Sequence, residues 1–134
     1  MSELTIEIVT PAGITYRGTV QSCTVPGADG QFQILREHAD LLAYLKIGEI
    51  KFKQADGEKR LATSGGFLEV LKNRISLVVE SAEFAGDIDV ERAKDAEKRA
   101  RERLAKKGEV DTLRAEMALA RALNRLKISS QLRG

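Results

Sequence analysis

Apolar and polar residues alternate one by one along the first 84 residues of the chain. Leu4, Ile6 and Ile8 do so near the start, and Ile75 and Leu77 near the end. A period of two places alternate side chains on one face of a strand. Turn-forming glycine, Asp-Gly and Lys-Asn pairs separate these stretches at intervals of about ten residues. The predicted strands cover residues 3–10, 14–25, 31–36, 46–54, 59–64, 66–71 and 74–80.

This spacing, without intervening helical patterns, predicts an all-β sandwich or barrel over residues 1–84. Residues 41–45 are apolar on every side. We interpret them as a loop or strand that packs against the core or against a partner.

From Asp87 onward the period changes to three and four, which is typical of helices. A first helix is expected to begin at Asp87 or Asp89, since either carboxylate can cap the exposed amides of a helix N-terminus. Its apolar positions are mostly alanine. A break at residues 107–108 precedes a second helix, capped by Asp111 and running to about Ser129. The pattern predicts an antiparallel helical hairpin over residues 85–134.

Charge is distributed unevenly between these two parts. Residues 1–84 carry nine basic and eleven acidic side chains, whereas residues 85–134 carry thirteen and nine. The basic tail suits an acidic protein surface or an anion. Two Tyr, four Phe and no Trp argue against base stacking on nucleic acid. A small β-barrel that binds anions or nucleic acid through a basic helical tail stays open as the alternative function.

The residues needed for catalysis are missing. His38 is the only histidine, and nothing at useful spacing supports a triad or a metal site built around it. Gly65-Gly66 lies between two strands and lacks the Lys and Ser/Thr of a phosphate-binding loop. We therefore expect a protein that is not an enzyme and holds no metal or prosthetic group.

Compartment and membrane association follow from two further features. A single cysteine, Cys23, cannot form an internal disulfide, which fits a reducing compartment, and its place in an alternating stretch predicts a buried side chain. No apolar run is long enough to span a bilayer, and there is no secretory leader. Any membrane association is therefore expected to be indirect.

Four arginines in the helical part are candidates for an anion site. If the hairpin turns near residues 108–109, Arg92 lies level with Arg125, and Arg99 lies near Arg121. Arg92 and Arg99 share a helix face, as do Arg121 and Arg125. Converging guanidinium groups are stabilised by an anion, and their planar forks suit phosphate oxygens. The alternative is that all four point into solvent.

Motifs spread over nearly the whole chain resemble the epsilon subunit of bacterial and chloroplast F-type ATP synthases. The most specific stretches are the Ser-Gly-Gly-Phe-Leu-Glu-Val run at residues 64–70 and the Asp-Ile-Asp-Val-Glu-Arg-Ala run at 87–93. Weaker matches lie at residues 9–13, 29–35 and 38–42. Residues 121–126, Arg-Ala-Leu-Asn-Arg-Leu, resemble the second helix of members that bind ATP.

The resemblance implies a non-catalytic subunit of the central rotor stalk. Its β-sandwich would bind the gamma subunit and the c ring, and so help couple proton-driven rotation to the catalytic alpha and beta subunits. The helical hairpin would either fold against the sandwich or extend along gamma and block ATP hydrolysis. In some members ATP binds the folded hairpin. The protein would then lie at the cytoplasmic face of a bacterial plasma membrane, peripheral through the complex.

The resemblance also assigns roles to single residues. The ATP-contacting set would be Glu83, Asp89, Arg92, Ala93, Arg99, Arg121 and Arg125. Its carboxylates would accept hydrogen bonds from adenine or ribose, while its arginines hold phosphates. Partner contacts would come from His38, Leu41 and Leu42 on the sandwich and from Arg114 and Lys127 on the extended hairpin, with Arg121 and Arg125 again taking part.

One loop departs from the family pattern. Asp40 stands where the family often has proline, and Arg36-Glu37 precede His38 where Pro-Gly is usual. A charged loop without proline is expected to be less rigid. This loop lies near the expected contact with the c ring.

Overall fold

The protein is described from a computed structural model that covers residues 3–106 and 112–133. The chain divides into two units, residues 1–84 and residues 85–134, and each is considered by itself.

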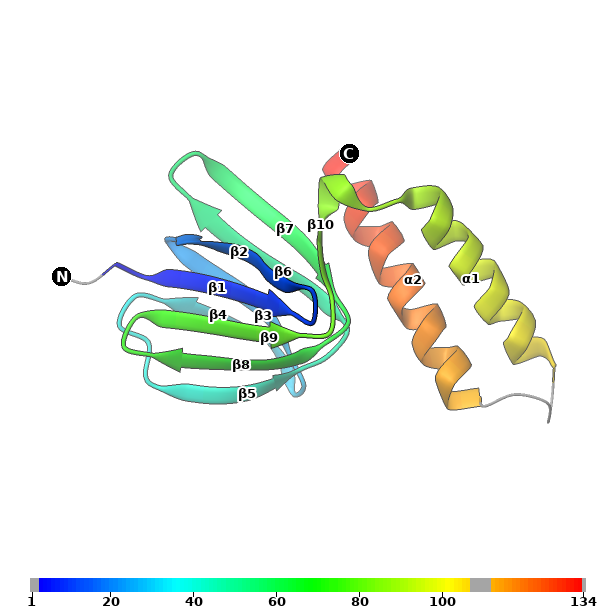
Figure 1. Cartoon of the computed structure of the whole chain (residues 1–134), viewed down its shortest axis with the longest axis horizontal. Coiled ribbons are helices and arrows are strands. Elements are labelled where there is room, and N and C mark those ends of the chain that lie inside the picture. Colours follow the sequence, from blue (N-terminus) through cyan, green and yellow to red (C-terminus); the bar gives the residue numbers. More distant parts are fainter. Residues whose placement is uncertain (1–2, 107–111, 134) are drawn as a thin grey trace. The chain divides into compact units, whose positions relative to one another are not determined.

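Strands make up the first unit and helices the second (Figure 1). The strands are β1 (Thr5–Thr10), β2 (Gly13–Thr19), β3 (Ser22–Gly27), β4 (Gly30–Leu35), β5 (Leu41–Leu45), β6 (Gly48–Gln54), β7 (Gly57–Thr63), β8 (Gly66–Leu71), β9 (Arg74–Val79) and β10 (Ala82–Phe84). The helices are the 3-10 turn η1 (Ala85–Asp87), α1 (Val90–Ala105) and α2 (Thr112–Arg133).

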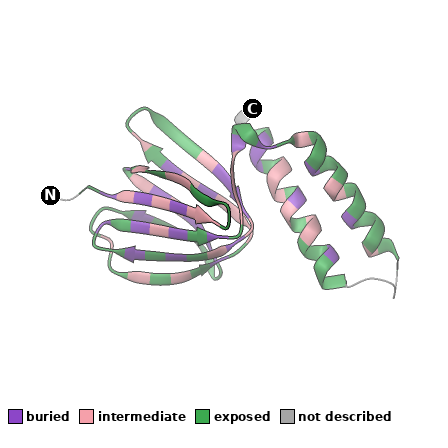
Figure 2. Ribbon diagram, in the orientation of Figure 1, coloured by how far each residue is buried: buried purple, intermediate pink, exposed green. Residues whose placement is uncertain are grey.

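The strands form one hydrogen-bonded sheet that folds over into two layers. One layer has the order β2-β1-β9-β8-β5, and the other is made of β4, β3, β6, β7 and β10. A single residue pair, Gly27 with Leu45, joins β3 to β5 where the layers meet. Buried side chains alternate with exposed ones along the strands (Figure 2). The predicted sandwich is therefore confirmed.

The core lies between the layers and consists of the inward-facing set of each strand. Its members are Leu4, Ile6, Ile8, Val20, Cys23, Val25, Ile34, Leu45, Ile50, Phe52, Leu61, Leu68, Val70, Ile75, Leu77 and Val79. All are less than a tenth exposed.

The predicted strand over residues 14–25 is wrong, because the structure divides it into β2 and β3. At the break, the Val20 amide donates to the Leu4 carbonyl and the Gln21 amide donates to the Lys53 carbonyl. Leu4 lies just before β1 in one layer, whereas Lys53 belongs to β6 in the other. The chain therefore changes layer here, and its buried apolar positions shift phase from Val20 to Cys23 and Val25, a three-residue step that the predicted single strand overlooked. Residues 41–45, left open between loop and strand, form β5.

Gly65-Gly66, between β7 and β8, lies at another of the points where the chain changes layer. Both residues have positive φ, at 105° and 153°. A Cβ on Gly66 would lie 2.2 Å from the Val78 carbonyl oxygen, and one on Gly65 would lie 2.8 Å from the Leu45 oxygen. Because Cβ atoms do not approach backbone this closely, only glycine fits at this crossing.

β10, which the sequence did not predict, ends the first unit. It pairs antiparallel with β7, with Phe84 opposite Leu61. The Phe84 ring packs edge-on against Tyr16, with ring centroids 5.9 Å apart, and Tyr16 in turn lies 4.9 Å from Phe52. Phe84 thus fixes β10 to the core at the last residue before the helical unit.

In the second unit, α1 and α2 pack side by side and run in opposite directions (Figure 1). Asp89 is the N-cap of α1: its Oδ1 accepts from the Arg92 amide at 3.0 Å. This supports the second of the two predicted start sites. The predicted cap Asp111 and the break at residues 107–108 lie outside the described residues. α2 continues to Arg133, beyond the predicted end near Ser129.

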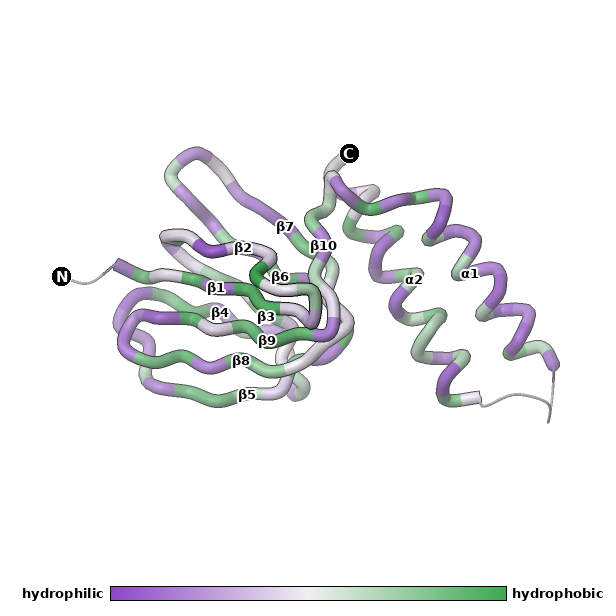
Figure 3. Tube along the Cα trace, viewed as in Figure 1, coloured by the Kyte–Doolittle hydropathy of each residue, from purple (hydrophilic) through white to green (hydrophobic). Residues whose placement is uncertain are grey.

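Small residues form the contact between the two helices. Ala93 and Ala100 are the buried residues of α1, and Ala115, Ala122 and Ser129 are buried at the same seven-residue spacing on α2. Seven residues make two turns, so each set forms one stripe. Figure 3 shows that the rest of α1 is largely hydrophilic. The hairpin therefore has a close but narrow interface.

Cys23 is predicted to resist thiol reagents in the native protein. Burial raises the pKa of its thiol from 9.0 to about 12. At pH 9 an exposed thiol would be about half ionised, whereas Cys23 stays protonated and covered. We expect no labelling by a maleimide or disulfide reagent in buffer at pH 9, and complete labelling in urea. Rapid labelling of the folded chain would contradict this.

Phe84→Ala is predicted to destabilise the sandwich by about 2 kcal/mol, since it removes a partly buried ring from an aromatic contact. Urea unfolding followed by tyrosine fluorescence measures this, because both tyrosines lie in the first unit. Tyr44→Ala is the matched control: Tyr44 is exposed, and its change should stay within about 0.5 kcal/mol. Equal effects of the two substitutions would overturn the role given to Phe84.

Candidate functional surfaces

An apolar row crosses the outward face of the first layer. Cross-strand pairing places Tyr44 opposite Phe67, Phe67 opposite Val78, Val78 beside Val9, and Val9 opposite Ile14. The row therefore runs over five neighbouring strands. Its side chains are exposed by 77% for Tyr44, 45% for Phe67, 42% for Val78 and 56% for Ile14.

Such a row is unlike scattered surface apolar residues, because its members are contiguous across the sheet. A contiguous apolar patch on a folded protein marks a surface that another molecule covers. An open pocket of about 490 Å³ adjoins Tyr44; it is lined by the β3–β4 turn, Phe32 and residues 41–44 of β5. The recess lies at the β5 end of the row, beside the outward face rather than on it, since Phe32, Leu41 and Ala43 pack against the core.

Two of the three predicted partner contacts on the sandwich lie in β5, and one lies in the loop before it. Leu42 is 70% exposed and points outward two residues before Tyr44, so it extends the apolar row. Leu41 points the other way and packs against the core. His38 is half-buried, and its Nδ1 lies 2.7 Å from the Ala39 carbonyl oxygen.

The four predicted arginines lie along one edge of the hairpin. Arg92 and Arg99 each precede a buried alanine of α1 by one residue, and Arg121 precedes Ala122 in the same way. In two antiparallel helices, residues one position before the interface fall on the same side of it, by the 100° rotation per residue. Arg125, three positions after Ala122, falls on that side too.

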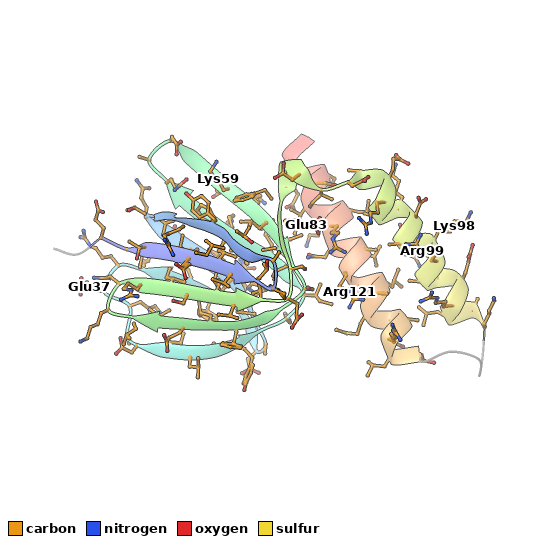
Figure 4. All side chains as sticks on the ribbon, in the orientation of Figure 1. Glu37, Lys59, Glu83, Lys98, Arg99 and Arg121 are labelled. Atoms are coloured by element: carbon orange, nitrogen blue, oxygen red, sulfur yellow. The ribbon has the colours of Figure 1, made fainter. Side chains whose placement is uncertain are left out.

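This arginine edge, defined by Arg92, Arg99, Arg121 and Arg125, takes residues from both helices. Figure 4 labels Arg99 on α1 and Arg121 on α2. Arg92 and Arg99 are exposed, whereas Arg121 and Arg125 are half-buried. Clustered guanidinium groups repel one another in the absence of an anion, and they offer several planar donor forks to one that binds.

Arg114 belongs to the same edge, which sequence reasoning missed. It precedes the buried Ala115 by one residue, as Arg121 precedes Ala122. The signal was present in the seven-residue spacing of Arg114 and Arg121, but it required the buried stripe of α2 to be known. Lys127 is exposed and lies five residues after Ala122, away from this edge.

The remaining members of the predicted ATP set have visible structural roles. Asp89 caps α1, Ala93 is buried in the helix interface, and Glu83 is half-buried on β10 beside Ala62 of β7. Asp89 and Ala93 belong to the same unit as the arginine edge, whereas Glu83 belongs to the sandwich.

Metal binding and membrane crossing find no support in the described residues. Over residues 3–106 and 112–133, no group of three or more His, Cys, Asp or Glu side chains is arranged to hold a metal ion. Within the same ranges, neither helix has the length and apolar character needed to cross a bilayer.

Comparison with known proteins gives matches over both units. Residues 3–85 match the family described as ATP synthase, Delta/Epsilon chain, beta-sandwich domain, and residues 87–130 match its long alpha-helix domain. An ATP synthase epsilon chain of Desulforamulus reducens is 46% identical over 123 residues, which cover 91% of this chain and 93% of the relative. One from Syntrophomonas wolfei is 42% identical over 132 residues, covering 97% and 96%.

Solved structures share the fold at lower identity. A chain in the cryo-EM structure of Euglena gracilis mitochondrial ATP synthase, OSCP/F1/c-ring, superposes with a TM-score of 0.82 at 18% identity, covering 98% of this chain and 82% of that one. A chain of the Tetrahymena thermophila mitochondrial ATP synthase central stalk and c ring gives 0.58 at 15% identity, covering 99% and 98%. The two family domains together and the relatives at over 40% identity show that the chain belongs to the ATP synthase delta/epsilon chain family, as an epsilon chain of the F-type complex.

Proposed function

We propose that this chain is a non-catalytic rotor subunit of the central stalk, which helps couple rotation of the c ring to the catalytic head. The observation that carries the proposal is the apolar row across five strands, since it calls for a stable protein partner. The Euglena and Tetrahymena neighbours come from ATP synthase assemblies that include a c ring, which fits this role.

In this proposal the sandwich has two partners. The gamma subunit covers the apolar row, and the c ring meets the loop that carries His38, with Leu41 and Leu42 next to it. The protein is then held peripherally at the cytoplasmic face of the membrane through the complex. No apolar helix of its own is needed for that attachment.

The helical hairpin is proposed to regulate ATP hydrolysis. ATP would bind the folded hairpin with its phosphates on the arginine edge, assisted by Asp89 of the same unit. Its phosphate oxygens would accept charge-assisted hydrogen bonds from guanidinium groups of both helices, which favours the folded form. Since a ligand shifts a two-state population only by its differential affinity, the folded fraction would follow the ATP concentration.

The extended hairpin would use some of the same arginines differently. Arg114, Arg121, Arg125 and Lys127 would then meet acidic surfaces of the catalytic alpha and beta subunits and block hydrolysis. ATP and the catalytic head would compete for Arg121 and Arg125. This competition gives a physical reason for one ligand to control inhibition.

The double substitution Tyr44→Ser/Phe67→Ser is predicted to weaken binding of the full chain to purified gamma subunit at least about tenfold, because central aromatic contacts dominate interface energy. Surface-immobilised gamma titrated with the chain measures this. Lys53→Ser, an exposed position on β6 in the other layer, is the control and should bind as the wild type does. Failure of the wild-type chain to bind gamma would refute the rotor assignment, and salt-dependent retardation of DNA would favour the nucleic-acid alternative.

Arg92→Ala is predicted to weaken ATP binding by the isolated chain at least about tenfold, since it removes a charge-assisted contact to phosphate. Calorimetric titration with ATP measures the dissociation constant. Arg101→Ala is the matched control: Arg101 is an exposed arginine of α1 one residue beyond Ala100, on the opposite edge, where its Nε donates to Glu97 at 2.9 Å. ATP affinity should be unchanged by this substitution.

Two results would contradict the regulatory site. If the wild type fails to bind at millimolar ATP, the arginine edge is left to the catalytic head, while the rotor role stands. If Arg92→Ala and Arg101→Ala weaken binding equally, the arginine edge acts only through overall charge.

A further inference from the structure

Asn73 joins three segments at one end of the sandwich. It lies in the two-residue turn between β8 and β9, where it and Lys72 both have positive φ, at 63° and 47°. Its carbonyl oxygen accepts from the Thr5 amide at 2.9 Å, which ties the turn to the start of β1. Its side chain reaches the third segment, the loop of residues 36–40 between β4 and β5. Asn73 is only 7% exposed, unusually low for a turn asparagine.

The Asn73 carboxamide forms hydrogen bonds to Glu37 through both its oxygen and its nitrogen. Its Oδ1 accepts from the Glu37 backbone amide at 2.7 Å, and its Nδ2 donates to the Glu37 Oε1 at 2.8 Å. The pair is reciprocal, and its side-chain bond is charge-assisted, which makes that bond stronger than a neutral one. Figure 4 labels Glu37 at this end of the sheet.

This pair explains how the loop keeps an unfavourable backbone conformation. Glu37 has φ of 66°, in the left-handed region that side chains other than Gly, Asn and Asp rarely adopt. The Lys72 amide also donates to Asp40 Oδ1 at 3.3 Å, and the His38 amide donates to the Leu35 carbonyl at 3.1 Å. Hydrogen bonds from the β8–β9 turn therefore restrain a loop that has no proline to restrain it.

The restrained loop leads directly into the proposed partner surface. Residue 41 begins β5, and the outward-facing Leu42 and Tyr44 follow. The loop itself presents charged residues and the half-buried His38. A loop that is already ordered loses little conformational entropy when a partner binds, which strengthens binding without any new contact.

We infer that Asn73, through its reciprocal pair with Glu37, is a positioning residue that holds the 36–40 loop in the conformation that docks on the c ring. The inference rests on the proposed rotor function and adds to it a residue that would not itself touch the partner. The hydrogen bonds of this pair restrain the loop backbone, as the ring of a proline would do in a loop that contained one.

The test exchanges donors and acceptors between the two side chains. Asn73→Asp places two carboxylates face to face and breaks the side-chain bond, while the aspartate still tolerates positive φ. Glu37→Gln keeps the carbonyl oxygen that Asn73 Nδ2 needs. In the double variant E37Q/N73D, the new carboxamide at position 37 donates to the new carboxylate at position 73, which rebuilds the pair with its polarity reversed.

The chain is assembled with gamma and titrated against purified c ring in detergent. We expect N73D to bind about tenfold more weakly than the wild type, whereas E37Q/N73D should bind about as tightly as E37Q, the reference variant that lacks the same Glu37 charge. Hydrogen exchange of the isolated chain should show the Glu37 amide exchanging faster in N73D only. Lys59→Gln, an exposed change on β7 (Figure 4), is a neutral control.

The outcomes separate this inference from the proposed function. If the wild-type assembly does not bind the ring, the ring contact itself is wrong. If the wild type binds and N73D binds equally well, the positioning role is wrong while the rotor function stands. If N73D weakens binding but E37Q/N73D does not restore it, the carboxylate acts through charge or general destabilisation, and the inference is overturned. Urea unfolding of each variant identifies a purely structural effect.

Discussion

The structure depends on the close backbone approach at Gly65-Gly66. There the chain leaves β7 in one layer and enters β8 in the other, so closely packed against Leu45 and Val78 that no side chain has space. β8 lies between β5 and β9, and it brings Phe67 between Tyr44 and Val78. The proposed partner surface is therefore a consequence of this crossing: a shift in β8 register by one residue would turn Phe67 inward and Leu68 outward.

The sandwich and the hairpin differ in the side chains that stabilise each of them internally. The sandwich encloses large branched and aromatic side chains between two layers. The hairpin, in contrast, joins its helices through alanines, which bury little area and leave the arginine edge close to the interface. With about 0.8 kcal/mol gained per buried methylene, an alanine interface gives a modest free energy of association. A bound anion on that edge therefore has a large effect on the stability of the hairpin, compared with the packing of the two helices.

Sequence reasoning predicted the fold class and the element types, because both depend on local periodicity. It offered Asp87 or Asp89 as the N-cap of α1, since capping is a local role, and the structure shows Asp89. It left β5 open because its residues are apolar on both faces. It failed at Val20-Gln21, where the shift in phase of the apolar alternation was overlooked, and at β10, whose three residues are too few to show a period. Sequence reasoning could place the four arginines on one edge, because the helix period and an assumed turn position are enough to define that edge. It could not find the role of Asn73: Lys72-Asn73 reads as a turn, and no periodicity links it to Glu37, 36 residues earlier.

The packing of Phe84 determines where a movement of the helical unit would begin. In the proposed regulation, the hairpin would pivot in the short segment between Phe84 and the cap at Asp89, because β10 is fixed to β7 and to Tyr16 up to Phe84. Beyond the pivot, α1 has 16 residues and α2 has 22, which at 1.5 Å per residue are rods of about 24 and 33 Å. Under that proposal, Phe84 is the last fixed residue, and helix length sets how far each helix extends beyond it.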